Sequence, residues 1–543
     1  MAPKSRIIID TDPGVDDILA LLLAFSAKPE ELEVLLVSLT FGNIDVQNCL
    51  RNAVSLFHWI EKETAWRKEN GLPEGFEALR AHKPLVAVGA EEPLADQLMM
   101  ADYFHGIDGL GGIHSSHPHL TPEETWKSLF ASALSSSDAD TVAAAKEAQQ
   151  PNALFTPSTQ RSHLEILRLL RENEPNTISI VAVGPLTNCA LAAAEDPETF
   201  LRAKEVIVMG GAIDETGNVQ PPSPPKASTE RPPPFNLIKR PETPLRAALN
   251  KRNQVSPVAE FNTYADSIAA ARVYALTSAL PESTMPPIPP ASAGQEKEHL
   301  RPYPKNLSEK LKVVLFPLDI TSKHELTRGQ FDRSVSQHLA AGSPLATWTN
   351  AFVSSTFRKI ESLSSSAADS VPETVALELH DPLCVWYALQ PDSPLWKFAP
   401  GREDRKGLDG EEDWGEDIRI ETSGQWTRGM CVVDRRERRL RKNDDGEGGE
   451  VPGDTGNWLS RKAGNRIKSG IGLRVTDVDF KEEMEMVFIR DRWPRFKCGS
   501  EEWPFSLQYF VRNGIVIQNY VIHRPPEKQQ ADESGGKKPT QPQ

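Results

Sequence analysis

Residues 6–24, RIIIDTDPGVDDILALLLA, predict a strand, a turn and a helix in immediate succession. The apolar run 6–9 is short enough to be a buried strand, Pro13-Gly14 interrupts it, and the apolar stretch 18–25 predicts the first turns of a helix. Four carboxylates fall within eight residues at this junction: Asp10, Asp12, Asp16 and Asp17. A fold that buries this strand and helix must also accommodate that negative charge.

Carboxylates this close together raise one another's pKa unless positive charge lies among them. The basic residues nearest in sequence, Lys4 and Arg6, lie at the far end of the predicted strand. A hard divalent cation with oxygen ligands is the simplest partner, and Ca²⁺ suits a flexible carboxylate cage better than Mg²⁺ does. The alternative is that two aspartates cap the helix, where negative charge is favourable, while the other two line a turn. Because capping accounts for one or two of the four, we expect a metal or sugar site here.

The predicted strands alternate with predicted helices, which favours an α/β fold with a mostly parallel sheet flanked by helices. Beyond the first strand, the apolar runs that predict strands are 34–40, 85–88, 178–183, 205–209 and 311–316. Ligands of such sheets bind outside the carboxyl ends of the strands. Asp12 and Asn43 follow the first two predicted strands, so we expect both at that edge, although an Asn after a strand is ordinarily turn chemistry.

Composition limits the classes of function. The net charge of −15 argues against a nucleic-acid binder, which needs a basic face. No apolar run reaches the length of about 18 residues that a membrane helix needs. Five widely spaced cysteines without a C-x-x-C pair favour free thiols in a reducing compartment. The first strand begins at residue 6 with no signal-peptide-like segment before it, so we expect a cytoplasmic protein.

Composition also predicts how the chain is organised. We expect one α/β domain over 1–435, with disordered insertions at about 114–160, 219–256, 281–305 and 400–416. The remaining ranges are expected to be a charged low-complexity linker at 436–470, elements packed on the same domain at 471–524, and a disordered tail at 525–543. Three histidines of the first insertion are close enough to suggest a metal, but we expect a solvated setting for them: His114, His117 and His119.

The segment D-x-D-P-G-x-D-D at 10–17 resembles the signature of the nucleoside hydrolases, the inosine-uridine preferring nucleoside N-ribohydrolase family. Other motifs similar to those of this family follow in the same order, separated by the insertions. They are H-G-x-x-G-x-x-G at 105–112, G-x-L-T-N at 184–188, M-G-G at 209–211, G-N at 217–218, E-F-N at 260–262, L-D-x-T at 318–321 and H-D-P at 380–382. The resemblance implies a Rossmann-like open sheet of the nucleoside-hydrolase type.

The resemblance also implies a calcium site. Asp12 would both bind Ca²⁺ and act as the base that activates a calcium-bound water. Asp17, Asp381 and the backbone carbonyl of Val183 would complete the protein ligands. His380 would protonate the leaving base, because a histidine can be charged near neutral pH, and His105 is the second candidate for that role.

The substrate contacts implied by the resemblance lie on several segments. His105 would bind the base, and the residues that would hold the ribose are Asp16, Asn43, Met209, Asn218, Glu260 and Asn262. Met209 as plain core filler and His105 as a surface-loop residue are the structural alternatives. In extended chain Glu260 and Asn262 project to the same side, a geometry that can grip two vicinal hydroxyls.

The implied reaction is hydrolysis of the N-glycosidic bond of ribonucleosides to ribose and free base, in purine or pyrimidine salvage, by a monomer or a homo-oligomer. Two other classes remain open. Asp10-x-Asp12 at a strand end also resembles the nucleophile and acid pair of haloacid-dehalogenase-like phosphatases, a chemistry that would not require Asp381. The third possibility is a non-catalytic protein that binds a nucleoside or a metal.

Overall fold

The structure is a computed structural model in which a defined part of the chain is described. The described residues are 3–95, 98, 102–122, 154–218, 256–287, 297–363, 372–401, 415–436, 438–441 and 451–473. The predicted tail at 525–543 and the apolar alternation expected within 471–524 lie outside them, apart from 471–473. Most of the predicted insertions also lie outside them.

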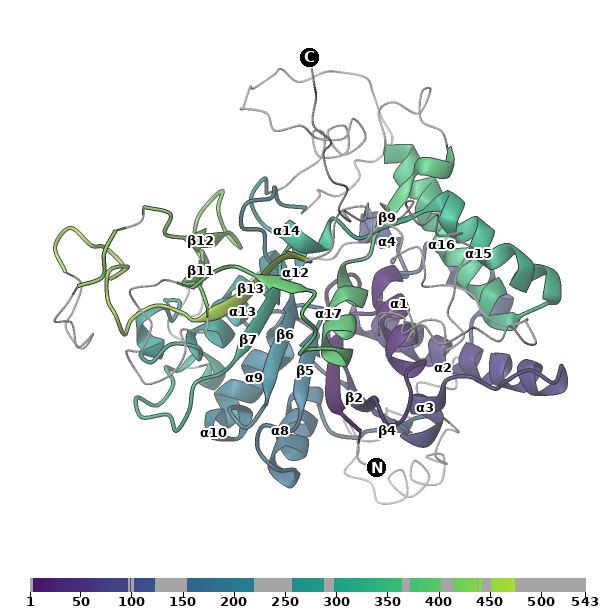
Figure 1. Cartoon of the computed structure of the whole chain (residues 1–543), viewed down its shortest axis with the longest axis horizontal. Helices are drawn as coiled ribbons and strands as arrows, with labels where there is room; N and C mark the ends of the chain where they lie inside the picture. The colour runs from purple at the N-terminus through teal and green to yellow at the C-terminus, as the bar shows by residue number, and fades with distance from the viewer. Residues whose placement is uncertain are drawn as a thin grey trace, which may run out of the picture.

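A central, mostly parallel sheet organises this part of the chain (Figure 1). The strands are β1 (Ser5–Thr11), β2 (Leu32–Leu39), β3 (Leu85–Val88), β4 (Thr156–Pro157), β5 (Ser179–Ala182), β6 (Glu205–Met209), β7 (Val313–Phe316), β8 (Glu325–Thr327), β9 (Ala376–Glu378), β10 (Trp396–Phe398), β11 (Ile418–Ile420), β12 (Cys431–Val433) and β13 (Ile467–Leu473). Nine of the described strands form one sheet in the order β10-β13-β7-β6-β5-β1-β2-β3-β4. Every neighbouring pair in it is parallel except β10 with β13, and β8–β9 and β11–β12 are separate antiparallel pairs. The α/β prediction is confirmed.

Helices connect these strands and flank the sheet. The described α-helices are α1 (Val15–Phe25), α2 (Val46–Glu69), α3 (Glu77–Ala81), α4 (Asp102–His105), α5 (Ile113–Ser116), α8 (Ser162–Glu172), α9 (Thr187–Glu195), α10 (Pro197–Phe200), α12 (Phe261–Ala265), α13 (Ser267–Ala275), α14 (Leu318–Thr321), α15 (Arg328–Ala341), α16 (Pro344–Leu363) and α17 (His380–Leu389). Short 3₁₀ helices are η1 (Pro118–Leu120), η3 (Pro281–Ser283), η5 (Glu298–Leu300) and η6 (Pro372–Thr374). In the described part of the chain, no helix is both long enough and apolar enough to cross a membrane.

Two apolar cores lie on the two faces of the sheet, because successive side chains of a strand point to opposite faces. Ile7 and Ile9 of β1 join one core, which includes apolar side chains of α1, α2, α16 and α17. Ile8 joins the other core, which α8, α9 and α13 cover. A strand buried on both faces is a near-continuous apolar run, and this explains the sequence of β1.

The strand order of the sheet reverses at β1. From β1 the chain proceeds to β2 and β3 on one side, whereas β5, β6 and β7 follow in order on the other side. Ligands of open α/β sheets bind at the carboxyl edge where the strand order reverses in this way. The turns that follow β1, β2 and β5 therefore meet at this point, and they carry Asp12, Asn43 and Val183.

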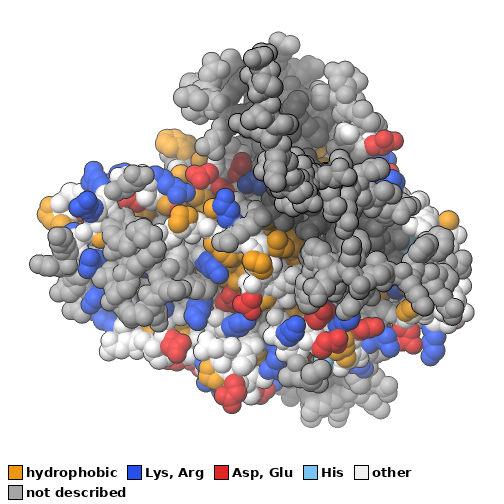
Figure 2. All heavy atoms as spheres, viewed as in Figure 1, with side chains coloured by type: hydrophobic (Ala, Val, Ile, Leu, Met, Phe, Trp, Pro, Cys, Tyr) orange, Lys and Arg blue, Asp and Glu red, His pale blue; other side chains and the backbone are white. Residues whose placement is uncertain are grey.

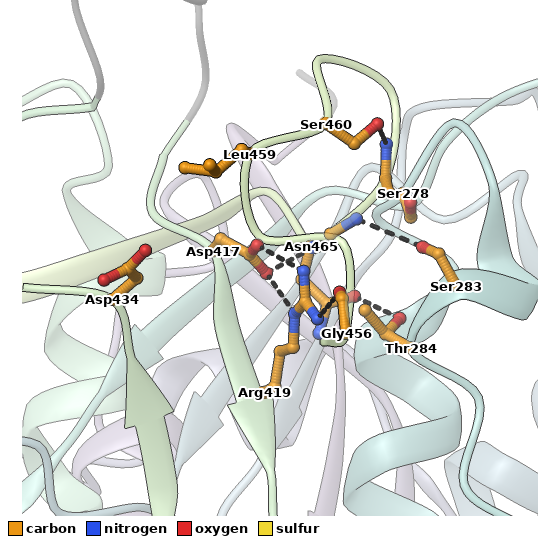
Figure 3. A network of polar contacts seen from close by, with 12 residues as sticks. Ser278, Ser283, Thr284, Asp417, Arg419, Asp434, Gly456, Leu459, Ser460 and Asn465 are labelled. Carbon is orange, nitrogen blue, oxygen red and sulfur yellow. Dashed lines mark hydrogen bonds and ion pairs between the residues drawn. The ribbon is translucent and has the colours of Figure 1, made fainter. Parts of the chain in front are cut away.

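The C-terminal part of the described chain belongs to the central sheet. We predicted a linker over 436–470, but β13 begins at Ile467 and pairs in parallel with β7 and antiparallel with β10. A polar network joins the preceding loop to the body of the protein (Figure 3). In it, Asp417 accepts hydrogen bonds from the Arg419 guanidinium and from the Asn465 backbone N–H. These hydrogen bonds hold the charged, glycine-containing segment 451–466 against the rest of the protein.

The surface of the molecule carries charges of both signs. On the face seen in Figure 2, lysine and arginine side chains are interspersed with aspartate and glutamate side chains. Among the described residues, exposed side chains of opposite charge form ion pairs, such as Arg168 with Glu172. The net charge of −15 is therefore a small excess over many opposite charges.

Candidate functional site

The turn between β1 and α1 buries several carboxylates at the carboxyl edge of the sheet. Asp12 follows the last residue of β1, and Asp16 and Asp17 lie in the first turn of α1. Asp12 and Asp17 are fully buried and Asp16 is 7% exposed. The carboxylates are buried because β1 and α1, on either side of the turn, pack their apolar residues into the core.

Asp17 holds the turn together. Its carboxylate accepts hydrogen bonds from the Thr11 hydroxyl at 2.6 Å, the Gly14 N–H at 3.0 Å and the Asn43 side-chain amide at 2.9 Å. Burial nevertheless raises the pKa of Asp17 above its usual value. These bonds join the turn after β1 to the turn after β2, so Asn43 is placed beside the aspartates.

The Asp12 carboxylate occupies a narrow space between two glycines. Its Oδ2 accepts a hydrogen bond from the Asn43 backbone N–H at 2.7 Å, whereas its Oδ1 is buried with no hydrogen-bond partner among the described residues. A Cβ built on Gly184 would lie 2.6 Å from Oδ1, and one on Gly42 would overlap Oδ2. Both positions therefore require glycine, and burial followed by the charge of Asp17 raises the pKa of Asp12 well above its usual value.

Helix α17 adds a further carboxylate to the same place. It packs against α1, and its Asp381 is 3% exposed. One carboxylate oxygen from each of Asp16, Asp17 and Asp381 lies within 4.8 Å of the others. Burial and the neighbouring aspartates raise the pKa of Asp381 well above its usual value, and burial followed by the charge of Asp17 raises that of Asp16 to about 6.

These carboxylates are compatible with a hard divalent cation, because the donors are oxygens and their charges are crowded. The unsatisfied Asp12 Oδ1 is a further free oxygen donor, although Asp12 lies outside the group of three. The Val183 carbonyl accepts a hydrogen bond from the Asn262 amide at 2.8 Å. A carbonyl oxygen has two lone pairs, so this bond leaves one acceptor site on Val183.

The proposed ribose contacts of the later segments gather at the start of α12. Glu260 is the N-cap of α12 and accepts from the backbone N–H groups of Gly211, Asn262 and Thr263 at 2.7–2.9 Å. Asn218 accepts from the Phe261 N–H at 2.8 Å. The extended geometry assumed for Glu260 and Asn262 differs from the structure, since the helix begins between them and Asn262 is its second residue.

Met209 and Asn262 connect this cluster to the aspartates. The Asn262 amide lies 3.3 Å from the Met209 carbonyl and 3.4 Å from its sulfur, and it also donates to the Val183 carbonyl. Val183 precedes Gly184, the residue that faces Asp12 Oδ1. Asn262 therefore lies between the Glu260 cluster and the Asp12 turn.

Two histidines lie at the site, and their pKa values are shifted in opposite directions. Both ring nitrogens of His380 have partners, with Nδ1 2.9 Å from the Thr321 hydroxyl and Nε2 3.3 Å from Glu378. Burial lowers the pKa of His380, but the hydrogen bond and charge of Glu378 outweigh it, so the pKa is raised. Burial lowers the pKa of His105 to about 3, which leaves this ring neutral near pH 7.

His105 lies against the aspartate turn. Its Nδ1 is 3.5 Å from the Val15 backbone nitrogen, and a Cβ on Gly14 would lie 2.9 Å from the same atom. That hypothetical Cβ would also lie 2.8 Å from the Asn43 amide. Glycine at position 14 thus lets the ring of His105 and the side chain of Asn43 approach the backbone closely.

Some residues of the site were not singled out from the sequence. Thr321 belongs to the L-D-x-T motif, and Glu378 lies two residues before the H-D-P motif. Asp10, in contrast, was one of the four aspartates expected at a metal or sugar site, but it lies outside the group of three. It accepts hydrogen bonds from the Ser38 hydroxyl and the Asn188 amide, and burial raises its pKa to about 6. The phosphatase alternative needs Asp10 as its nucleophile, and it is not favoured because Oδ1 of Asp10 is held by Ser38 and Asn188 and Asp10 is not in the group formed by Asp16, Asp17 and Asp381.

The chain is similar to known proteins. A family model described as "Inosine-uridine preferring nucleoside hydrolase" matches residues 7–455. A Schizosaccharomyces pombe protein, described as uncharacterised, is 26% identical over 79% of this chain and 89% of the relative. Uridine nucleosidase 1 of Arabidopsis thaliana is 32% identical over 41% of this chain and 49% of its own length, so that match spans about half of the plant protein. Pyrimidine-specific ribonucleoside hydrolase RihA of Salmonella agona is 24% identical over 79% of this chain and 88% of the relative.

Proposed function

Because the chain belongs to the inosine-uridine preferring nucleoside hydrolase family, we propose that it hydrolyses the N-glycosidic bond of ribonucleosides to ribose and free base. The observation that supports this most directly is the group formed by Asp16, Asp17 and Asp381, whose carboxylate oxygens lie within 4.8 Å of one another. Asp16 and Asp17 belong to α1, near the start of the chain, whereas Asp381 belongs to α17. Their meeting at the carboxyl edge of the sheet is the arrangement that a cation-dependent hydrolase requires.

In this proposal Asp12 is the general base. Asp12, Asp17, Asp381 and the Val183 carbonyl would hold Ca²⁺, which when bound lowers the pKa of a water molecule. The Asn43 N–H fixes Oδ2 of Asp12, so that the free Oδ1 can accept a proton from the attacking water. A single attack by water on the anomeric carbon predicts inversion of configuration there.

In the proposal, the ribose is held by side chains that surround the Asp12 carboxylate. They are Asp16, Asn43, Met209, Asn218, Glu260 and Asn262, which offer oxygen, amide and thioether groups. Negative charge at Asp16 and Glu260 favours the oxocarbenium-like transition state more than the neutral sugar of the substrate. The backbone N–H groups that bind Glu260 keep its carboxylate in place as this charge develops.

His380 is our candidate for the acid that protonates the leaving base. Thr321 and Glu378 hold its two ring nitrogens, so donation to the base requires the Nε2 proton to move from Glu378 toward the substrate. His105 is neutral and lies against Gly14, where it can hydrogen-bond the base. We further propose a cytoplasmic role in purine or pyrimidine salvage, with which the free, buried Cys49, Cys189, Cys384 and Cys431 are compatible.

The test is ribose release by the purified chain from inosine, uridine, cytidine and adenosine, with and without a chelator. We expect release from at least one nucleoside and its loss when divalent cations are removed. Asp12→Ala should lower kcat by at least about a hundredfold, because the base is lost. Asp332→Ala, which removes an exposed carboxylate on α15, is the control. Near-normal turnover by Asp12→Ala, or no release from any nucleoside, would contradict the proposal.

A further inference from the structure

Asn52 of α2 is buried beneath the aspartate turn and has no exposed surface. Its side-chain nitrogen donates hydrogen bonds to the carbonyls of Pro13 and Asp108, each at 2.8 Å. Its side-chain oxygen lies 2.7 Å from Nε2 of His114. One amide therefore contacts the turn that carries Asp12 and, at two points, the glycine-rich segment that carries His105.

The segment 105–114, called here the glycine loop, is organised from within by Asp108. The two oxygens of this carboxylate accept the backbone N–H groups of Leu110, Gly112 and His114 at 2.7–3.0 Å. Gly109 has a φ of +77°, and a Cβ there would lie 2.9 Å from the Asn52 amide. The loop is thus a preformed unit that packs directly on Asn52.

His114 fixes the orientation of the Asn52 amide. The Asn52 oxygen can only accept, so Nε2 of His114 must carry the hydrogen of this bond. Nδ1 of the same ring lies 2.8 Å from the Thr121 hydroxyl, which can donate to it. When the Asn52 oxygen faces His114, its NH₂ group faces the carbonyls of Pro13 and Asp108. Both carbonyls need a donor, and the NH₂ group supplies it.

The outer side of the glycine loop has its own anchor. Ser355 of α16 donates a hydrogen bond to the Gly111 carbonyl at 2.9 Å, and α4, α1 and α16 lie together in Figure 1. This anchor holds the loop to α16 but does not reach Pro13. Apart from the 3.5 Å contact between His105 Nδ1 and the Val15 nitrogen, the contacts through Asn52 join the loop to the backbone beside Asp12.

We propose that Asn52 is a positioning residue for the hydrolysis proposed above, joining the glycine loop to the Asp12 turn so that His105 stays against Gly14. The inference rests on that function for its kinetic consequence. Since His105 is the proposed contact to the base, loss of the junction should weaken substrate binding more than the chemical step. Asp12 keeps its own contacts to Asn43 and so retains its role as base.

The experiment compares Asn52→Leu with the native chain. Leucine has nearly the same shape but makes no hydrogen bonds, so we expect KM to rise about tenfold or more while kcat changes less than about threefold. Hydrogen exchange of the amides in 105–114 should also become faster, and exchange in α17 should not. Ser55→Ala is the control, because Ser55 lies one turn further along α2 and its hydroxyl bonds only the Arg51 carbonyl of that helix.

A second pair of variants covers the case in which Asn52→Leu does not fold. His114→Gln can present an amide N–H where Nε2 lies and should keep the native KM, whereas His114→Leu should raise it and should loosen the loop. Unchanged exchange and unchanged KM in Asn52→Leu, or equal behaviour of the two His114 variants, would overturn the inference. A native chain that releases no ribose would instead contradict the proposed function, while the exchange measurement would still decide whether Asn52 holds the loop.

Discussion

The protonation state of a side chain depends on the groups that face it, and His114 of the glycine loop is the clearest case. Burial lowers its pKa to about 4, although the charge of Asp108 acts in the opposite direction and Arg51 in the same one. The neutral ring donates to Asn52 and contacts Thr121. A histidine that must stay neutral in the folded state makes folding depend on pH.

The sign of this dependence can be predicted. The folded-state pKa of His114, about 4, is below its ordinary value of 6.5, so its contribution to stability is fully present above pH 6.5. It is lost as the pH falls from 6.5 toward 4, where the unfolded chain binds the proton and the folded chain does not. Melting temperatures measured across this range should fall less steeply for His114→Gln than for the native chain. His119→Gln, at an exposed position of the same segment, is the control, and parallel curves for all three proteins would contradict the prediction.

At the scale of elements, β13 is a structural part of the sheet. It lies between β7 and β10, and Asn465 two residues before it is 1% exposed. The Asn465 amide donates to the Ile418 carbonyl at 2.7 Å, and its oxygen accepts from the Thr284 hydroxyl at 2.6 Å (Figure 3). One side chain thus joins β11, the loop after η3 and the start of β13.

Asn465→Ala should therefore lower the free energy of unfolding by about 1–3 kcal/mol, because buried hydrogen-bond partners are left unsatisfied. Urea unfolding followed by circular dichroism measures this. Ser423→Ala, which removes an exposed hydroxyl bonded locally to Glu421, serves as the control and should change stability by less than about 0.5 kcal/mol. A loss no larger than that of the control would show that the network of Figure 3 does not hold β13 in place.

At the scale of the whole molecule, the site is assembled from segments that lie far apart in sequence. The turn after β1 contributes Asp12, Asp16 and Asp17, the start of α17 contributes Asp381, and the start of α12 contributes Asn262. Helices α1 and α17 bury their apolar residues in one of the two cores, and α12 buries Ala265 in a smaller cluster with Phe41 and Ala90. The crowding of carboxylates is thus a consequence of how the sheet and helices pack, and a bound cation would offset its electrostatic cost.

Much of this could be predicted from the sequence, for identifiable reasons. The apolar runs of β1, β2, β5, β6 and β7 are strongly patterned, so the parallel sheet followed from them. The relative placement of Glu260 and Asn262 could not be predicted in this way. Glu260 caps helix α12, and the spacing of residues alone does not show that a helix begins after it. β13 was missed since glycine and charge surround it in the sequence. The role of Asn52 depends on contacts across 56 residues, from α2 to Asp108, which no local pattern contains.

Calcium binding measured by titration calorimetry tests the convergence of these segments most directly. We expect the native chain to bind one Ca²⁺, and Asp17→Asn and Asp381→Asn each to weaken binding at least about tenfold, because each removes a charged ligand from a different helix. Asp319→Asn, whose carboxylate binds the backbone N–H groups of Ile213 and Asp214, is the control and should bind as the native chain does. Native chain that binds no Ca²⁺, or equal affinity in the native chain and both variants, would contradict a shared cation site.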